Sequence, residues 1–530
     1  MVFLAACVAR WPAGADSIVP PLLSIQQINP LTVALSWTNS APGFVLESMD
    51  SLAGSQPWIG VLPAPQLVDP QLVVTQFIGT ITGSARFFRL ASIGSPIKSL
   101  LPNIGDEVDD QDGNPNTKTF VLCASDNPGD VVTVTAEPDP PVAEDDLPSS
   151  WSLTGGTGSG KLSRTIDRTT PGIYIVKATT GGSVKTTTVI IFKIQVTNIK
   201  FNYDTNSSTH DAINVRQNYF IPYAITNGEW IQGVQNLPAC YAANRTVNIQ
   251  ARFTLEPAID ADADIWAGST GINGSLGDIA KTHVTFSSGV SSPEYVTLQV
   301  SGTMPAKIQK TTTDTWQWQM EHFKGSQSAP CNLNSSGPHT IYTILSEPAP
   351  PWDNTAGSAQ NAWTQVLDMS CTWAAGAVDE SNTVAKMTLS AYSEFAKTYT
   401  YDALQTHSPG TICELTGMLY DNVVDCQDMS SVVQLFTRIV GVATVQRLRV
   451  NGPFNYGPIL PIGESTWIDG DWNFHQFAWD YGAVYDACAK LNQSAPYSPT
   501  DADLNGSYKA NLFDSGTWNP LPPDTITFFY

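Results

Sequence analysis

Short runs in which apolar and polar residues alternate set the strongest limit on how this chain can fold. Stretches such as "LTVALSW" and "RTVNIQARFTLEP" place apolar residues at about every second position, and Pro, Gly and Ser separate them. Because successive side chains of a strand point to opposite faces, this period predicts strands with one buried face. Only 14% of the residues are charged, whereas Gly and Pro number 39 and 37, which favours pleated strands and tight turns over long surface helices.

A chain of 530 residues is too long for one hydrophobic core and should divide into roughly three to five domains. We expect a multidomain, mainly β protein with a C-terminal α+β portion. Changes in the sequence pattern predict a possible signal segment over residues 1–19 and three β-sandwiches over 20–96, 97–197 and 198–350. The α+β domain is expected over residues 351–530. The simplest interpretation of 97–197 is an immunoglobulin-like sandwich. Segment 20–96 resembles the fibronectin type III-like modules of secreted bacterial proteins through its closing Phe-Phe-Arg-Leu, Phe87 to Leu90, which implies spacing or adhesion.

The N-terminus has the features of a secretion signal, although it lacks a basic start. An apolar run from Val2 to Ala9 precedes an Ala-Gly-Ala that would suit a signal peptidase. An ordinary apolar tail is the alternative. No other run approaches the roughly 20 apolar residues that span a bilayer, so we expect a secreted or cell-surface protein without a membrane span.

The net charge argues against two classes of partner, and the cysteines bear on metal sites and disulfides. A net charge of −22 repels the phosphate backbone of nucleic acids and anionic lipid surfaces, both of which bind through Lys and Arg clusters. Among the eight cysteines there is no C-x-x-C pair, so we expect no zinc site. If Cys7 leaves with a signal, seven cysteines remain, which allows one free thiol and up to three disulfides.

Two further motifs suggest ligands, but each has a simpler interpretation. "GGTGSGKLS" nearly matches a phosphate-binding loop but has Leu162 where a Ser or Thr must reach magnesium, and its flanks are strand-like, so we predict a glycine-rich hairpin. "IDADADIW" places Asp260, Asp262 and Asp264 on one strand face, and Ile265 stands where a calcium loop requires Gly. We therefore predict a solvated strand face, and no cofactor or metal.

Beyond residue 351, periods near 3.6 residues predict helices. Val384, Met387, Ala391 and Phe395 share one face of a helix that Asp379 can cap. A second helix begins after Cys426 in "DCQDMSSVVQLFTRIVGV" and should stop at Gly441. A cysteine at a helix N-terminus has its pKa lowered by the dipole and has backbone donors beside it. Two other interpretations of Cys426 stay open: it is half of a disulfide, or it is an ordinary packed residue.

A nucleophilic thiol also needs a base and a group that orients the base. His475 is the only histidine after Cys426, and "WNFHQFAWDYGAVYDACAKL" reads as two strands joined near Tyr481 and Gly482. Such a hairpin can bring Asp486 beside His475. Cys488 lies two residues further on and is a possible disulfide partner of Cys371 or Cys413.

In order and approximate spacing, Cys426, His475 and Asp486 resemble the triad of the transglutaminase-like branch of the papain-like fold, over roughly residues 361 to 493. The resemblance implies that Cys426 is the nucleophile, His475 the general base and later acid, and Asp486 the residue that holds the imidazole tautomer. Trp373 is a candidate for supporting the oxyanion. Asp425 and Asp428 flank the cysteine and would oppose thiolate formation through like charge.

These observations lead to two hypotheses. The first is an exported cysteine-dependent acyl transferase or hydrolase that acts on protein or peptide amides and needs no cofactor. The second is a catalytically inactive surface protein that uses the same folds for binding or structure. The sequence indicates neither an oligomeric state nor a role for residues 494–530.

Overall fold

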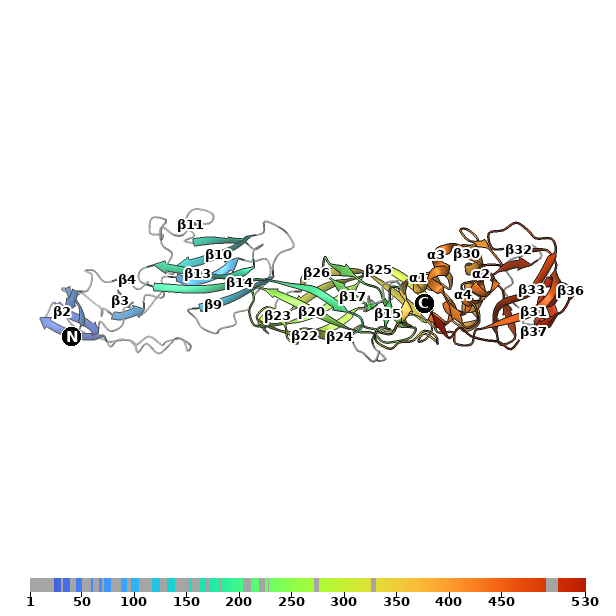
Figure 1. Ribbon diagram of the computed structural model, residues 1–530. Helices are drawn as coiled ribbons and strands as arrows, with labels where there is room; N and C mark the ends of the chain where they lie inside the picture. The colour runs from blue at the N-terminus through green and yellow to red at the C-terminus, as the bar shows by residue number, and fades with distance from the viewer. Residues whose placement is uncertain are drawn as a thin grey trace. The chain divides into compact units, whose positions relative to one another are not determined.

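A computed structural model gives the fold and describes the following residues: 23–29, 32–38, 44–49, 59–60, 66–68, 71–77, 87–92, 97–103, 117–123, 131–138, 152–153, 162–167, 171–180, 183–203, 211–218, 225–226, 228–270, 276–325, 330–491 and 504–530. The possible signal segment and most of the glycine-rich loop lie outside them. The chain forms two compact units, Met1–Phe192 and Lys193–Tyr530, and is mainly β, as predicted (Figure 1). The finer division into four domains stays a prediction.

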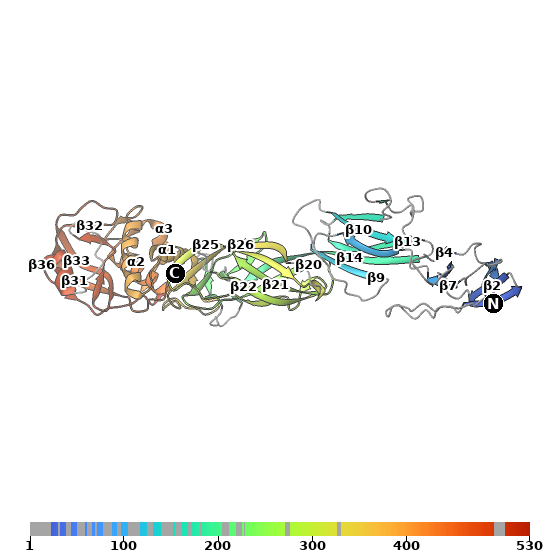
Figure 2. The same ribbon diagram turned by 180° about the vertical axis from the view of Figure 1, so that it is seen from behind.

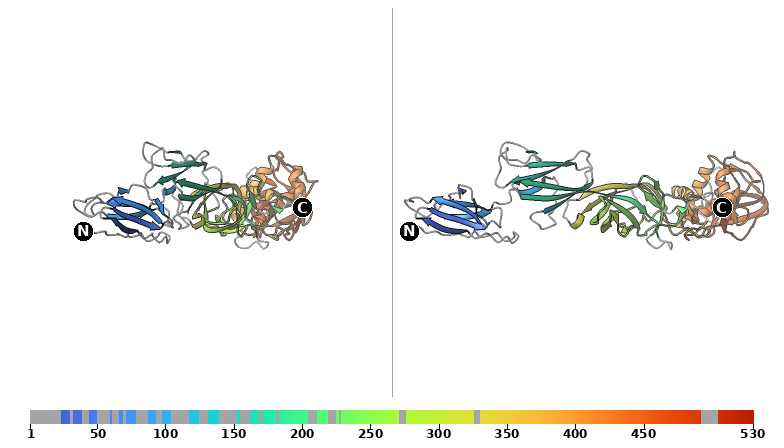
Figure 3. Two further views of the ribbon diagram at one scale, coloured as in Figure 1. Left: turned by 90° about the vertical axis from the view of Figure 1, so that its left-hand side faces the viewer. Right: turned by 60° about the vertical axis from the view of Figure 1, so that its left-hand side comes forward.

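The first unit consists of short strands in several sheets (Figure 3). Two sheets have the orders β1-β2-β6-β5 and β4-β3-β7, built from Ser24–Asn29, Thr32–Thr38, Phe44–Met49, Ile59–Gly60, Gln66–Val68, Gln71–Phe77 and Phe87–Ser92 as β1 to β7 in chain order. The third has the order β11-β12-β10-β8, from Ile97–Asn103 (β8), Val131–Pro138 (β10), Ser152–Leu153 (β11) and Leu162–Asp167 (β12). The predicted Phe-Phe-Arg-Leu strand is thus the start of β7.

The glycine-rich motif lies between two antiparallel strands. Ser152 pairs with Ser163, and Leu153 pairs with Leu162. A phosphate-binding loop would lead into a helix, whereas a strand follows here. The prediction of strands on both sides is confirmed.

A long strand, β14 (Ser183–Lys200), crosses the boundary between the units. Its first part pairs with β13 (Gly172–Thr180) and, in parallel, with β9 (Thr117–Cys123). Its last part pairs with β17 and β20 and is the third strand in a sheet of order β18-β17-β14-β20-β23-β22-β21-β25-β26-β19. That sheet is built from Glu229–Ile231, Gln235–Asn236, Ala239–Ala242, Asn248–Glu256, Ala261–Ser269, Ile279–Ser287, Val290–Ser291, Val296–Gln299, Gln309–Glu321 and Cys331–Ile344, which are β17 to β26 in chain order (Figure 2).

The predicted strands of this sheet are confirmed. In β20 the residues alternate between more and less buried positions from Asn248 to Leu255, the pattern from which the strand was predicted. The two-residue strands β15 (Val215–Arg216), β16 (Ile225–Thr226) and β27 (Ala362–Trp363) form a separate small sheet.

The C-terminal part of the second unit contains helices as well as strands. Its helices are α1 (Thr364–Trp373), α2 (Glu380–Phe395), α3 (Leu415–Asp421), α4 (Cys426–Ile439) and the short α5 (Lys509–Leu512). Its main sheet has the order β34-β33-β31-β36 with β37 also on β31, from Ala483–Tyr485, Gly470–Asp480, Gln446–Tyr456, Phe513–Gly516 and Asn519–Pro520. Helix α4 packs on β33 and beside α1 and α2. Small pairs complete the part: β28 (Thr400–Tyr401) with β30 (Val423–Val424), and β32 (Ile459–Pro461) with β35 (Ala489–Leu491).

Both helices predicted from periodicity are present. Asp379 caps α2 by accepting a hydrogen bond from the Asn382 amide, and the four residues of the predicted face are buried. Helix α4 ends at Ile439, and Gly441 takes a left-handed conformation with φ of 95°. Glycine adopts such a conformation without the steric cost of a side chain, which explains why the helix stops there.

Residues 504–530 belong to this part. Strands β36 and β37 extend the main sheet, and β38 (Phe528–Phe529) pairs in parallel with β29 (Ile412–Cys413). Within the described ranges, none of the helices has the length and apolar character needed to cross a membrane.

Candidate active site

Cys426 is the first residue of α4, as the sequence predicted. Asp425 precedes it as the N-cap: its carboxylate accepts a hydrogen bond of 2.9 Å from the Asp428 amide, and the Asp428 carboxylate accepts one of 3.3 Å from the Asp425 amide. This reciprocal capping satisfies two amides that a helix start leaves unpaired. The two aspartates beside the cysteine are therefore explained by the helix they begin.

The Cys426 thiol is enclosed, with 3% of the residue exposed. The backbone amide of Gln476 on β33 and the hydroxyl of Tyr401 on β28 form hydrogen bonds with its sulfur. Burial raises the pKa of the Cys426 thiol well above its usual value, and the charge of Asp425 raises it further, whereas the Gln476 amide lowers it. The expectation of a lowered pKa was wrong because removal of the thiolate from water outweighs the favourable helix end.

The predicted hairpin brings His475 and Asp486 together. Tyr481 and Gly482 form the turn between β33 and β34, both with positive φ, as in a two-residue hairpin. Asp486 follows β34, and its Oδ2 lies 3.0 Å from His475 Nε2. The same carboxylate accepts hydrogen bonds from the Tyr508 hydroxyl at 2.9 Å and the Cys488 amide at 2.8 Å.

The His475 ring is fixed by aromatic neighbours and is fully buried. Trp472 stacks on it with a centroid distance of 4.4 Å and an interplanar angle of 16°. The contact with Asp486 favours the tautomer with the proton on Nε2, which leaves the lone pair on Nδ1. In the part of the chain that the structure describes, Nδ1 has no hydrogen-bond partner. In this tautomer, Nδ1 is the ring nitrogen that can accept a proton.

All three predicted site residues therefore lie in one region, but within the described part of the chain a hydrogen bond joins only His475 and Asp486. The Gln476 amide that contacts the Cys426 sulfur belongs to the residue after His475, and the charge of Asp486 contributes to the raised pKa of Cys426. The His475 imidazole and the Asp486 carboxylate are within hydrogen-bond distance of each other. Among the described residues, no hydrogen bond joins Cys426 to His475, so the catalytic roles of the three stay predictions.

Trp373 lies against the far half of α4 rather than at its start, and its suggested role in supporting an oxyanion stays a prediction. Its ring stacks on Phe436 at 5.3 Å and packs edge-on against Phe395. Phe436 is ten residues along α4 from Cys426, about 15 Å at 1.5 Å per residue. Trp373 therefore packs the core between α1, α2 and the far half of α4.

A histidine that the sequence did not single out lies beside the start of α4. His407 is buried; its Nδ1 lies 3.2 Å from Asp428 Oδ2, its Nε2 lies 3.1 Å from Asp421 Oδ2, and its amide donates to Asp428 Oδ1 at 2.8 Å. The hydrogen bond with Asp428 is the main cause that raises the pKa of His407 to about 9. No sequence spacing indicated this contact, because His407 lies in a turn-rich loop and meets α4 only through the fold.

The six cysteines for which the structure describes a pairing state, Cys240, Cys331, Cys371, Cys413, Cys426 and Cys488, are all free thiols. The suggested pairing of Cys488 with Cys371 or Cys413 is therefore not found. Cys413 instead accepts a hydrogen bond from the Ser408 hydroxyl at 3.2 Å. The disulfide interpretation of Cys426 loses its support in this structure.

Comparisons with known proteins do not assign this chain to a family. No protein-family model matches the chain, and no curated relative matches its sequence. Among solved structures, the FN1-FN3 domains of chicken CNTN1 share 11% identity, with 59% of this chain and 98% of that one covered, at a TM-score of 0.13. A score this low carries no argument about the fold or the function of this chain.

Proposed function

We propose that this protein is an exported cysteine-dependent acyl transferase or hydrolase that acts on protein or peptide amides, with Cys426, His475 and Asp486 as its catalytic residues. One observation carries the proposal. The buried His475 imidazole lies 3.0 Å from the Asp486 carboxylate, and its Nδ1 has no hydrogen-bond partner among the described residues. The backbone amide of the next residue, Gln476, contacts the Cys426 thiol at the start of α4.

In the proposed reaction, His475 Nδ1 removes the thiol proton and the Cys426 sulfur attacks the amide carbonyl carbon. Asp486 stabilises the resulting imidazolium, as an aspartate does in other triads. The backbone amide of Cys426 is the donor for the developing oxyanion, because the Gln427 and Asp428 amides already donate to Asp425. The imidazolium then protonates the leaving nitrogen, the C–N bond breaks, and a thioester forms. Water or a primary amine, deprotonated by Nδ1, resolves the thioester and restores the thiol.

This reaction requires the site to open. Cys426 is 3% exposed and His475 and Asp486 are fully buried, so an amide carbon has no route to the sulfur in the closed arrangement. Tyr401 contacts the thiol, and its ring packs edge-on against Trp467 at 5.4 Å. Substrate binding must displace the Tyr401 hydroxyl from the sulfur before attack.

The test combines labelling with an acyl-transfer assay. The full chain is treated with iodoacetamide in the presence and absence of a glutamine-containing protein, and the modified cysteines are mapped by mass spectrometry. In parallel, incorporation of a fluorescent primary amine into that protein, and release of ammonia, are measured for the wild type, Cys426→Ala and Cys413→Ala. Cys413 is a matched control because it is also a buried free thiol.

We expect Cys426→Ala to lose activity and Cys413→Ala to keep it. Amine incorporation would identify a cross-linking enzyme, and ammonia release without incorporation would identify a hydrolase. Equal activity of Cys426→Ala and the wild type would rule out the proposal.

The second candidate is an inactive binding or structural protein, and the closed site favours it. A thiol whose pKa is raised by burial and that lacks a bond to the imidazole is a weak nucleophile. If Cys426 stays unlabelled with substrate present, and no variant alters acyl transfer, the scaffold function is correct.

A further inference from the structure

A group of donor side chains lies outside the candidate active site, on three adjacent strands of the large sheet. Asp264 on β21 pairs across the ladder with His283 on β22 and with Glu321, the last residue of β25. Residues directly opposite each other in antiparallel strands project from the same face. The sheet therefore places two carboxylates and an imidazole side by side.

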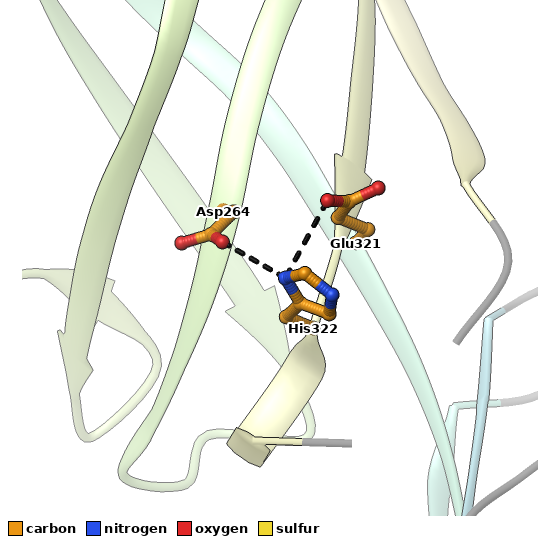
Figure 4. A group of neighbouring side chains, drawn as sticks. All are labelled: Asp264, Glu321 and His322. Atoms are coloured by element: carbon orange, nitrogen blue, oxygen red, sulfur yellow. Dashed lines mark hydrogen bonds and ion pairs between the residues drawn. The ribbon is translucent and has the colours of Figure 1, made fainter. Parts of the chain in front are cut away.

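The next residue, His322, joins the same face through an unusual backbone conformation. Successive side chains of a strand normally alternate, so His322 would point away from Glu321. Its φ is 56°, in the left-handed region that residues other than glycine rarely adopt. The ring turns back toward Asp264, and its Nδ1 lies 2.9 Å from Asp264 Oδ2 and 3.4 Å from Glu321 Oε1 (Figure 4).

The second imidazole approaches from the other side. His283 Nδ1 lies 3.0 Å from Asp264 Oδ1, so the carboxylate lies between two Nδ1 atoms. Ligand atoms from Asp264, Glu321 and His322 all lie within 4.8 Å of one another. No other group of three such donors with this spacing is found among the described residues.

We propose that Asp264, Glu321 and His322 bind a divalent transition-metal ion, with zinc as the best fit. One imidazole and two carboxylates make a three-donor set of the kind found in zinc sites with an open fourth position, at metal–ligand distances of about 2.0 to 2.2 Å. In a tetrahedral site such bonds set neighbouring donors about 3.3 to 3.5 Å apart, close to the 2.9 and 3.4 Å that separate His322 Nδ1 from Asp264 Oδ2 and Glu321 Oε1. Calcium and magnesium prefer sites built from oxygen ligands.

Two neighbours decide how well the ion is held. His283 Nδ1 lies 3.0 Å from Asp264 Oδ1, where a neighbouring imidazole orients a metal-bound carboxylate. Lys281 forms an ion pair with Glu321 and lies 4.5 Å above the Trp266 ring. Its ammonium competes with the metal for the carboxylate, and at 47% exposure its side chain can swing into solvent when an ion binds.

The sequence predicted a solvated strand face at Asp260, Asp262 and Asp264, because these residues lack the spacing of a calcium loop. The histidines that change this interpretation are 19 and 58 residues from Asp264. Only the pairing of β21 with β22 and β25 brings them together. Asp260 does not take part, since its Oδ1 accepts from the Ser288 amide at 2.7 Å.

The experiment uses the full chain, stripped with EDTA and dialysed against zinc chloride, with bound metal measured by elemental analysis and affinity by calorimetric titration. We expect one zinc ion that is lost in Asp264→Asn, and an affinity that falls at least tenfold in His322→Gln. Asp262→Asn is the matched control, because it removes the same charge from the same strand face without removing a donor. It should weaken binding by less than about threefold.

Two further readouts separate ligation from misfolding and from general attraction of cations. Lys281→Gln should bind zinc more tightly than the wild type, a gain that an unfolded variant cannot give. Cobalt should give the intense visible absorption of a tetrahedral site, and His322→Gln should lose it. The proposal fails if the wild type binds no zinc, or if Asp264→Asn and Asp262→Asn reduce binding equally.

Discussion

Oδ2 of Asp486 lies 3.0 Å from Nε2 of His475, and neither residue is exposed to solvent. A buried carboxylate is costly unless its oxygens are hydrogen-bonded. Asp486 meets this requirement with three partners, since the Tyr508 hydroxyl and the Cys488 amide also donate to it. The arrangement fixes the imidazole ring and its tautomer together.

Replacing Asp486 with Asn should therefore impair catalysis more than folding. The amide can still accept from Cys488, but it no longer requires a proton on His475 Nε2, so Nδ1 can become protonated and unable to act as a base. By analogy with other triads, the rate should fall by about 10³- to 10⁴-fold. The kcat for amine incorporation measures this effect. Tyr508→Phe keeps the carboxylate and imidazole pair, and a comparable loss in that variant would contradict the argument.

Tyr401→Phe should open the thiol to reagents. The substitution removes the hydroxyl that bonds the Cys426 sulfur and keeps the ring that packs against Trp467. We expect the rate of iodoacetamide alkylation at Cys426 to increase several-fold, as followed by mass spectrometry. Tyr399→Phe is the control, because that hydroxyl donates to the Leu419 carbonyl instead. An unchanged alkylation rate in Tyr401→Phe would mean that this hydroxyl does not restrict access.

Asp425 should have two separable effects on α4. Asn caps helices as well as Asp does, so Asp425→Asn should keep the helix start while removing a charge that raises the pKa of Cys426. Its alkylation profile should shift to lower pH. Asp425→Ala loses the cap as well and should cost about 1 kcal/mol of stability. Alkylation rates across pH and thermal unfolding measure the two effects, and a shift to higher pH in Asp425→Asn would refute the electrostatic part.

Stability should fall at alkaline pH because of His407. Its pKa is raised from 6.5 to about 9, chiefly by the hydrogen bond with Asp428, so the folded state holds the proton more tightly than the unfolded state. This shift corresponds to about 3 kcal/mol, which screening by solvent reduces to about 2 kcal/mol; the contribution is complete below pH 6.5 and is lost as the pH rises through 9. Thermal unfolding of the wild type and His407→Gln from pH 6 to 10 tests this. The two curves should converge at high pH, and a constant difference between them would contradict the assignment.

Local patterns were sufficient to predict α2, α4 and the hairpin that carries His475. In each case the signal lies within a few residues: the apolar period of Val384 to Phe395, the stop at Gly441, and the turn at Tyr481 and Gly482. The contact of His475 with Asp486 also followed, because the hairpin pairs Ala478 with Tyr485 and so places Asp486 diagonally across from His475.

Features that depend on distant segments were not predicted. Tyr401 and the Gln476 amide contact the Cys426 thiol only after β28 and β33 pack against the start of α4. The same is true of His407 on Asp428, and of the two histidines beside Asp264. The pKa of Cys426 was misjudged for a related reason: the helix start is visible in the sequence, but the depth of burial is not.

Arg447 joins the C-terminal residues to the helix that begins with Cys426, and its removal should loosen both. It is 1% exposed; Nε donates to Asp524 at 2.9 Å and a terminal nitrogen donates to the Ser431 hydroxyl at 3.1 Å. Arg447→Met leaves these groups and the Gly410 carbonyl without their donor, which should cost about 3 kcal/mol. Asp524→Asn should cost about 1 kcal/mol or less, because Asp524 is 46% exposed. Thermal unfolding and hydrogen exchange of residues 504–530 measure the difference, and equal effects of the two variants would show that burial of Arg447 contributes nothing.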